Sequence, residues 1–209
     1  MNTRTLPPPS SQPDPRIAFF NHHAHGWDDN PHSNANILHR LTHLRGRLGL
    51  HPGLQLLEVG CGTGFITGWL CDCVGASQVT AIDFSCAMLD QARAKGVAAA
   101  FQQLDICQQS PADAAFDLAL CFQSFPHFRD PRAALINVAR SLRQHGRLMV
   151  LHLVGSQEIN RFHRHVGGAV GGDLLPARHE WPELLGHAGL RMQSLEDRPD
   201  LFLLEAVRV

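Results

Sequence analysis

The sequence predicts an α/β fold in which helices cover a largely parallel β-sheet. Three observations carry this prediction. Residues 54–59 form a short apolar run without alternation, as expected for a strand buried on both faces. A glycine-rich turn and a helical pattern follow directly, and further strand-like runs alternate with helical segments along the chain. Two strand-like segments near the end, 190–196 and 201–208, are expected to pair as an antiparallel hairpin.

The composition of the chain indicates which binding partners and which cellular compartment to expect. The chain has 209 residues, 44% of them hydrophobic, and a formal net charge of −1. This charge gives no electrostatic footprint for nucleic acid or an acidic membrane. No apolar run reaches the ~18 residues that span a bilayer, and the N-terminus lacks the apolar core of a signal peptide. We therefore expect a cytoplasmic protein whose six cysteines, none in a C-x-x-C pair, are reduced thiols.

The N-terminal region is expected to contain a disordered leader and an arm. Residues 1–15 are rich in proline, which predicts disorder, and residues 16–209 are interpreted as a single domain. Within the arm, 16–50, an aromatic segment over 17–28 predicts a short helix or turn that packs onto the domain. Leucines at helical spacing over about 31–50 predict a longer helix.

The turn after the first strand has a spacing that separates two nucleotide-binding classes. Gly60, Gly62 and Gly64 let the backbone turn sharply and approach a ligand closely, before a helix over about 65–74. A dinucleotide fingerprint has the spacing G-x-G-x-x-G, whereas this turn reads G-x-G-x-G. An NAD-dependent oxidoreductase is therefore the disfavoured alternative. A P-loop is excluded because no G-K-[ST] follows.

The next strands also end in polar residues. Asp83 closes a strand over 79–83, where a carboxylate can accept both hydrogen bonds of a ribose diol. Ser85 is a predicted N-cap for a helix to about Lys95. Strands over 98–104 and 116–121 follow, and residues at the carboxyl end of the latter are expected to face a ligand.

The rest of the chain is predicted in outline. A helix is expected from Pro131 to about Gln144, a turn at 145–146 and a strand over 147–154. Residues 155–179 depart from a plain alternation, with a helical segment followed by a glycine-rich loop, and are interpreted as an insertion or lid. A helix over about 180–187 precedes the closing hairpin.

Two motifs resemble a known family. Residues 58–65 read E-V-G-C-G-T-G-F and residues 83–89 read D-F-S-C-A-M-L. They resemble the class I S-adenosylmethionine-dependent methyltransferases, in the small-molecule branch with a type 11 or menaquinone–ubiquinone methyltransferase-like core. The resemblance implies a Rossmann-like, doubly wound, seven-stranded sheet of order 3-2-1-4-5-7-6, with strand 7 antiparallel and helices on both faces. It also implies S-adenosylmethionine as the cofactor.

The same resemblance implies particular site residues. The segment from Phe20 to Asp28 is similar to an arm that covers the cofactor, which points to Trp27. Asp105 corresponds to an acid that binds the adenine amino group, and Ile106 to a backbone contact with the ring. Combined with the strand-end rule, the predicted cofactor-binding residues are Trp27, Glu58, Gly60, Cys61, Gly62, Gly64, Asp83, Phe84, Ser85, Met88, Asp105, Ile106, Phe122, Gln123 and His127.

The chemistry leaves the acceptor open. A methyl group on a sulfonium is already activated, so its transfer mainly needs alignment of the nucleophile, the carbon and the sulfur. A base is needed only where the acceptor must lose a proton. The sequence thus predicts methyl transfer to an O, S or N centre of a small molecule by in-line displacement. We expect a monomer or homodimer without nucleic-acid or membrane partners.

The histidines supply candidate catalytic groups. Of 14 in the chain, His127, His152 and His163 are predicted to converge with Asn160 over the methyl group and to provide a general base. His152 and His163 could instead hold a divalent metal, because neutral imidazoles are common metal ligands. The alternatives are then a metal-assisted methyltransferase or a metal-responsive, non-catalytic S-adenosylmethionine-binding protein. The plain alternative is that most of these histidines lie on surfaces or loops.

Overall fold

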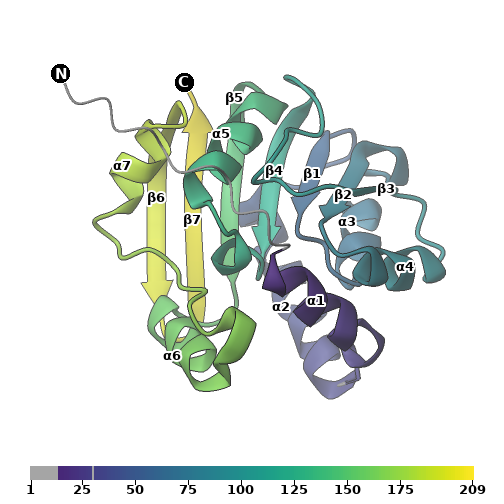
Figure 1. Ribbon diagram of the computed structural model, residues 1–209. Helices are drawn as coiled ribbons and strands as arrows, with labels where there is room; N and C mark the ends of the chain where they lie inside the picture. Colours follow the sequence, from purple (N-terminus) through teal and green to yellow (C-terminus); the bar gives the residue numbers. More distant parts are fainter. Residues whose placement is uncertain (1–13, 30) are drawn as a thin grey trace.

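The computed structural model describes residues 14–29 and 31–209, whose strands form one sheet (Figure 1). The strand order is β3-β2-β1-β4-β5-β7-β6. Strands β1 to β5 pair in parallel, whereas β7 is antiparallel to β5 and to β6. The predicted strand order and the reversed last strand are therefore confirmed.

The elements alternate as expected for this class of sheet. The strands are β1 (Leu56–Val59), β2 (Val79–Asp83), β3 (Ala100–Gln103), β4 (Phe116–Phe122), β5 (Leu142–His152), β6 (Leu190–Arg198) and β7 (Leu201–Arg208). The α-helices are α1 (Pro15–His23), α2 (Pro31–Leu48), α3 (Thr67–Val74), α4 (Cys86–Ala94), α5 (Pro131–Ser141), α6 (Ser156–Val166) and α7 (Trp181–Gly186). Short 3-10 turns include η3 (Phe125–His127) and η4 (Gly168–Val170). Across the described ranges, no helix has both the length and the apolar character that crossing a membrane requires.

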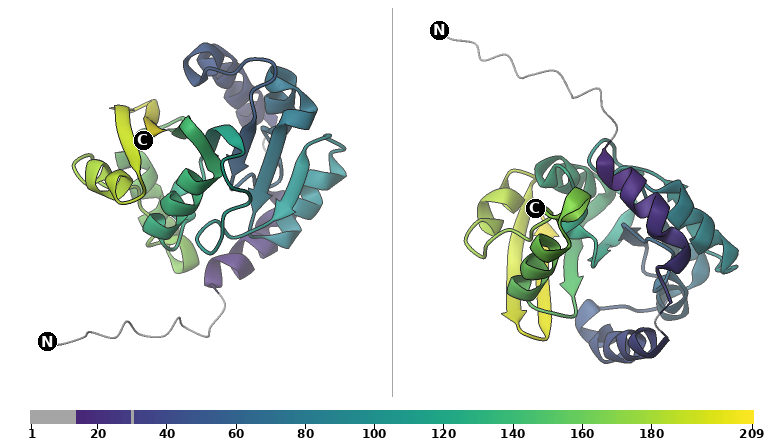
Figure 2. Two further views of the ribbon diagram at one scale, coloured as in Figure 1. Left: turned by 90° about the horizontal axis from the view of Figure 1, so that it is seen from above. Right: turned by 60° about the horizontal axis from the view of Figure 1, so that its bottom comes forward.

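Helices cover both faces of the sheet (Figure 2). Hydrophobic side chains pack between the helices and each face. Successive residues of a strand point to opposite faces. Leu57 and Val59 accordingly pack with α5 and α7, which contribute the fully buried Trp181. Leu56 packs on the other face with α2 and α3, including Leu41. The helices cover the two faces of the sheet. Other segments of the chain lie at the edge formed by the carboxyl ends of the parallel strands.

Two segments of the chain lie at that edge, below the carboxyl ends of the parallel strands (Figure 1). Helix α1 belongs to the predicted arm, and α6 with η4 belongs to the predicted lid. Helix α1 begins at Pro15, the last residue of the predicted leader, and the Asp14 side chain caps it by accepting a hydrogen bond from the Arg16 backbone. Residues 1–13 of the predicted leader lie outside the described residues. The division into leader, arm and lid stays a prediction.

The predicted turn at 145–146 lies inside β5, where the structure has a bulge. Strand β5 begins at Leu142, directly after α5, and its first residues are already extended. Phe116 pairs with Leu142 but Leu118 pairs with Arg147, so β5 carries several extra residues opposite β4. His145 takes a φ of 64° within this bulge. The bulge absorbs the residues that the sequence pattern assigns to a helix end and a turn.

Candidate functional site

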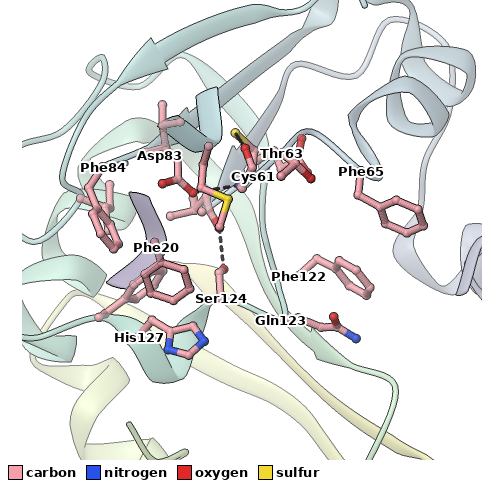
Figure 3. Close-up of a pocket in the computed structure, with 18 of the residues that line it drawn as sticks. Phe20, Cys61, Thr63, Phe65, Asp83, Phe84, Phe122, Gln123, Ser124 and His127 are labelled. Carbon is pink, nitrogen blue, oxygen red and sulfur yellow. Dashed lines mark hydrogen bonds between the residues drawn. The ribbon is translucent and has the colours of Figure 1, made fainter. Parts of the chain in front are cut away.

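A cavity of about 290 Å³ lies at the carboxyl ends of β1, β2 and β4 (Figure 3). This volume is close to the lower end of the range of about 300–1,000 Å³ for small-molecule sites. The glycine turn after β1 forms one wall, and the segment from Phe122 to Arg129 forms another. Phe20 of α1 and Ile37 of α2 close the cavity from the arm. The cavity therefore lies where the strand-end rule predicts a ligand site.

The glycine turn is shaped by what lies against it. Gly60 has a φ of 72°, and a Cβ there would lie 2.5 Å from the Cβ of Ser124. Gly64 has a φ of 69°, and a Cβ there would lie 2.9 Å from the Cβ of Ala92 on α4. Gly62 has open space beside it and borders the cavity. Gly60 and Gly64 thus allow the segment after β4 and helix α4 to approach the turn, whereas Gly62 leaves room for a ligand.

Two buried carboxyl groups face the cavity beside this turn. Glu58 is 2% exposed and accepts a hydrogen bond from Thr67 Oγ1 at 2.7 Å. Burial raises the pKa of Glu58 to about 8. Asp83 accepts hydrogen bonds from the backbone of Gly62 at 2.9 Å and of Ser85 at 2.8 Å, yet burial still raises the pKa of Asp83 to about 6. A positively charged or strongly hydrogen-bonding ligand would favour the ionised form of both groups.

Asp105 and Ile106 also line the cavity. The Asp105 carboxylate accepts a hydrogen bond from the backbone N–H of Cys107 at 2.8 Å, and another from Gln108 Nε2 at 2.8 Å. The Asp105 side chain therefore stabilises the turn that follows it and also borders the cavity. Each oxygen keeps a lone pair for a ligand donor.

All but two of the predicted cofactor-binding residues line this cavity. Those that do are Trp27, Glu58, Gly60, Cys61, Gly62, Asp83, Phe84, Met88, Asp105, Ile106, Phe122, Gln123 and His127. Gly64 packs against α4, as described above. Ser85 instead caps α4, because its Oγ accepts a hydrogen bond from the Met88 backbone at 3.2 Å and donates one to Asn21 Oδ1 at 2.7 Å.

Several lining residues are not among the predicted cofactor-binding residues. They include Phe20, Asn34, Thr63, Phe65 and Arg129. Thr63 donates a hydrogen bond to Asp28 at 2.9 Å, and Lys95 contacts the same carboxylate at 2.6 Å. This contact ties the arm to the glycine turn. Thr63 lies in the glycine motif and Asp28 in the aromatic arm segment, but only the fold shows that the two side chains meet.

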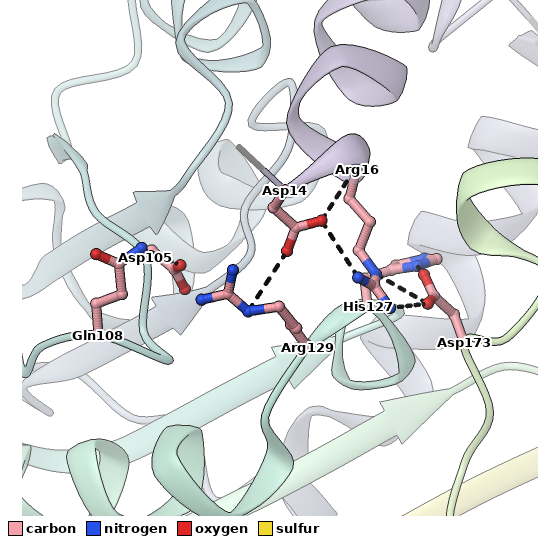
Figure 4. A network of polar contacts seen from close by, with 7 residues as sticks. All are labelled: Asp14, Arg16, Asp105, Gln108, His127, Arg129 and Asp173. Atoms are coloured by element: carbon pink, nitrogen blue, oxygen red, sulfur yellow. Dashed lines mark hydrogen bonds and ion pairs between the residues drawn. The ribbon is translucent and has the colours of Figure 1, made fainter. Parts of the chain in front are cut away.

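His127 lies at the cavity edge with a carboxylate behind it. Its Nδ1 is 2.8 Å from Oδ2 of Asp173, whose side chain is fully buried. The ring of Phe20 lies against His127 with 5.0 Å between ring centroids. Figure 4 shows Arg16 on the other oxygen of Asp173, at 2.6 Å from Nη2. Asp173 lies in the predicted lid, but the sequence interpretation gave it no role in the site.

His152 and His163 are both buried, but neither lines the cavity. The ring of His163 lies 4.9 Å from that of His127, so it packs behind the cavity residue. Within the described ranges, His152 Nε2 and His163 Nδ1 have no hydrogen-bond partner. The amide of Asn160 exchanges two hydrogen bonds with the backbone of Leu175. The convergence of Asn160 with the histidines over the methyl group stays a prediction.

The metal hypothesis for His152 and His163 finds no support. Over residues 14–29 and 31–209, no group of three or more His, Cys, Asp or Glu side chains is placed to hold a metal ion. The local contacts explain this result. Nδ1 of His127 is occupied by Asp173, and the guanidinium of Arg16 on the same carboxylate would repel a cation.

The burial of His152 predicts that folding is sensitive to acid. Burial, and then the charges of His127 and His163, lower the pKa of His152 to about 3. An unfolded histidine titrates near 6.5. Between these two values the unfolded chain binds a proton that the folded chain does not, so stability falls as the pH falls below about 6.5. From this group we expect a loss of about 2 kcal/mol between pH 8 and pH 5.

The variant His152→Leu isolates this contribution, because it removes the titrating group and keeps an apolar side chain of similar size. Urea unfolding at pH 8 and pH 5 should show a free energy of unfolding that falls about 2 kcal/mol less in the variant than in the parent chain. His187→Leu, at an exposed histidine, is the control. Equal pH dependence in His152→Leu and the parent would contradict the prediction.

Comparison with known proteins adds independent findings. A profile of the methyltransferase domain matches residues 57–150. An O-methyltransferase from Aspergillus sclerotiorum is 31% identical over 196 residues, which cover 85% of this chain and 71% of that protein. An O-methyltransferase from Pyrenophora dematioidea is 35% identical over 142 residues, 63% of this chain and 53% of that protein. The chain thus spans about half the length of the second relative.

Solved structures share the fold. An S-adenosylmethionine-dependent methyltransferase from Mesorhizobium loti superposes with a TM-score of 0.65 over 80% of this chain and 96% of that chain. Its sequence identity is 18%, so this likeness concerns the fold alone.

Proposed function

Since the chain belongs to the S-adenosylmethionine-dependent methyltransferases, we propose that it transfers the methyl group to a hydroxyl oxygen of a small molecule, with His127 as the general base. The single observation that carries the oxygen acceptor is the hydrogen bond between His127 and Asp173 at the cavity edge. The two relatives described above are both named O-methyltransferases, which supports the same acceptor atom.

The residues around the cavity suit the cofactor of this family. When bound, S-adenosylmethionine supplies a methyl group activated by a positively charged sulfur. Glu58 and Asp83 are buried carboxyl groups whose raised pKa values would fall beside positive charge or hydroxyl donors. The open space at Gly62 leaves its backbone accessible. Asp83 would hold the ribose hydroxyls, and Asp105 would receive the adenine amino group.

His127 is placed to remove a proton from an acceptor. A carboxylate can only accept hydrogen bonds, so the contact with Asp173 requires that Nδ1 of His127 carries the proton. Nε2 then keeps its lone pair and can take a proton from a hydroxyl group. A carboxylate acceptor would need no base, since it is already ionised at neutral pH. This arrangement therefore favours an alcohol, phenol or enol.

The lining of the cavity narrows the acceptor further. Phe20, Phe65, Phe122 and Phe128 surround the polar groups. Aromatic side chains favour flat apolar partners that stack or meet edge to face. We propose an aromatic or otherwise apolar hydroxyl compound as the acceptor.

Two measurements test this proposal. Calorimetry with S-adenosylhomocysteine should show binding, and its absence at millimolar concentration would reject the cofactor site. Methyl-labelled S-adenosylmethionine is then incubated with four sets of small acceptors, namely phenols including catechol, aromatic carboxylic acids, thiols and amines. We expect labelled product from the phenols. Label in the acid, thiol or amine sets without label in the phenols would contradict a hydroxyl acceptor.

A further inference from the structure

Asp173 connects three segments that are distant in the sequence (Figure 4). Its side chain is fully buried. One oxygen accepts from His127 Nδ1 at 2.8 Å. The other accepts from Arg16 Nη2 at 2.6 Å and from Arg16 Nε at 2.9 Å. All the donors are nitrogens of charged or titratable side chains, so the carboxylate is a shared anchor for the arm and for the base.

Helix α1 contacts this anchor in two ways. Arg16 and Phe20 are four residues apart and lie on one face of the helix. Arg16 binds Asp173, and Phe20 lies edge-on against the ring of His127. The helix therefore holds both the carboxylate and the imidazole. Asp14, which caps α1, also lies 3.9 Å from Arg129 on the segment that carries His127.

The charge of Asp173 is consistent with this role. Burial alone would raise the pKa of Asp173, but hydrogen bonds from His127 and Arg16 outweigh burial and lower it. The group is therefore ionised at neutral pH and accepts only. An ionised acceptor favours the form of His127 in which Nδ1 is protonated.

We propose that Asp173 and Arg16 are positioning residues, which hold His127 with a free Nε2 only while helix α1 is docked on the cavity. This inference rests on the proposed role of His127 as the base. It adds that the arm completes the catalytic group as well as covering the cavity. Loss of the Arg16 contact would leave Asp173 free to turn from His127, and the imidazole could then take the other tautomer.

The test reads the tautomer of His127 directly and needs no acceptor. The full chain is labelled with ¹⁵N-histidine, and ring-nitrogen chemical shifts are recorded at pH 8. The His127→Asn spectrum identifies the signals of His127. We expect the Nδ1–H form to exceed the Nε2–H form by roughly tenfold or more in the parent chain, the effect of a hydrogen bond to a charged group. Asp173→Asn and Arg16→Gln should each reduce this excess severalfold.

Hydrogen exchange of the α1 amides provides the second measurement. Arg16→Gln should exchange about tenfold faster than the parent over residues 15–23, because the helix loses its buried ion pair. Arg47→Gln is the matched control, since it removes a surface pair with Glu196. Arg16 is only partly buried, so its variant is expected to fold even if Asp173→Asn does not.

The outcomes separate the parts of the proposal. An unchanged tautomer excess in Asp173→Asn, or in Arg16→Gln if only that variant folds, would reject the positioning role. A change in Asp173→Asn without any change in Arg16→Gln would reject the coupling to the arm. Full methyl transfer by His127→Asn would reject the proposed role of His127 as the base. The tautomer measurement would still decide whether Asp173 and Arg16 orient the imidazole.

Discussion

Replacing Asp83 with alanine is expected to weaken S-adenosylhomocysteine binding by 100-fold or more. The expectation follows from two proposed hydrogen bonds between the ribose hydroxyls and an ionised carboxylate, each of which contributes about 1.5–3 kcal/mol. A 100-fold loss corresponds to only about 2.7 kcal/mol. The carboxylate also accepts a hydrogen bond from the backbone of Gly62, so its loss would make the glycine turn less rigid as well. Isothermal titration calorimetry measures the dissociation constant.

Asp117→Ala is the control for this variant. Asp117 is also an aspartate on a central strand, and it also accepts a backbone hydrogen bond, from Gln55 at 2.9 Å. It lies at the start of β4, whereas the cavity lies at the strand's end. Asp117→Ala should lose stability but keep its affinity for S-adenosylhomocysteine. Binding by Asp83→Ala within threefold of the parent would contradict the assignment.

Replacing His127 with asparagine should slow methyl transfer to a phenol by roughly 10²–10⁴-fold, the usual contribution of a general base. The amide nitrogen of asparagine can still donate to Asp173, but nothing remains at the position of Nε2. The affinity for S-adenosylhomocysteine should stay within about threefold of the parent. The rate of single-turnover transfer from a labelled donor measures the effect.

The rate of methyl transfer by His127→Asn should also depend on pH. A phenol ionises near pH 10, so part of the lost rate should return in His127→Asn as the pH rises from 7 to 10. The control His187→Ala, at an exposed histidine on the far end of α7, should follow the parent throughout. An unchanged rate in His127→Asn at pH 7 would remove His127 from the mechanism.

The sheet and the cofactor end of the cavity could be predicted because their signals are local. Gly60, Gly62 and Asp83 lie at strand ends, and the carboxyl ends of parallel strands meet at one edge. The order of strands came from the resemblance of residues 58–65 and 83–89 to a family. Such short motifs survive where a backbone must pass close to a ligand.

The acceptor end could not be predicted, because its groups meet only through the fold. Asp173 follows a glycine-rich loop and Arg16 directly follows a proline-rich segment, and nothing in the sequence indicates that these two side chains meet. His152 and His163 are predicted from residue type and from their positions on a strand and a helical segment, but both are buried outside the cavity lining. Residue type indicated the right region of the chain but could not tell a lining group from a buried neighbour.

The start of β5 shows the same limit for secondary structure. Helix-favouring residues continue past Ser141, and His145-Gly146 is typical of a turn. Pairing with β4 nevertheless makes Leu142 extended. Tertiary pairing therefore outweighs local preference at this position.

The close approach of Gly60 and Ser124 has a consequence for natural variation in this protein. The two residues share one small space, since a Cβ at position 60 would lie 2.5 Å from that of Ser124. Ser124 Oγ also donates to the Val59 carbonyl at 2.6 Å, which leaves little freedom to move aside. A side chain at position 60 would therefore require position 124 to move. Among descendants of this chain, a larger side chain at 124 would need a different path for the glycine turn, so substitutions there should be confined to residues no larger than serine.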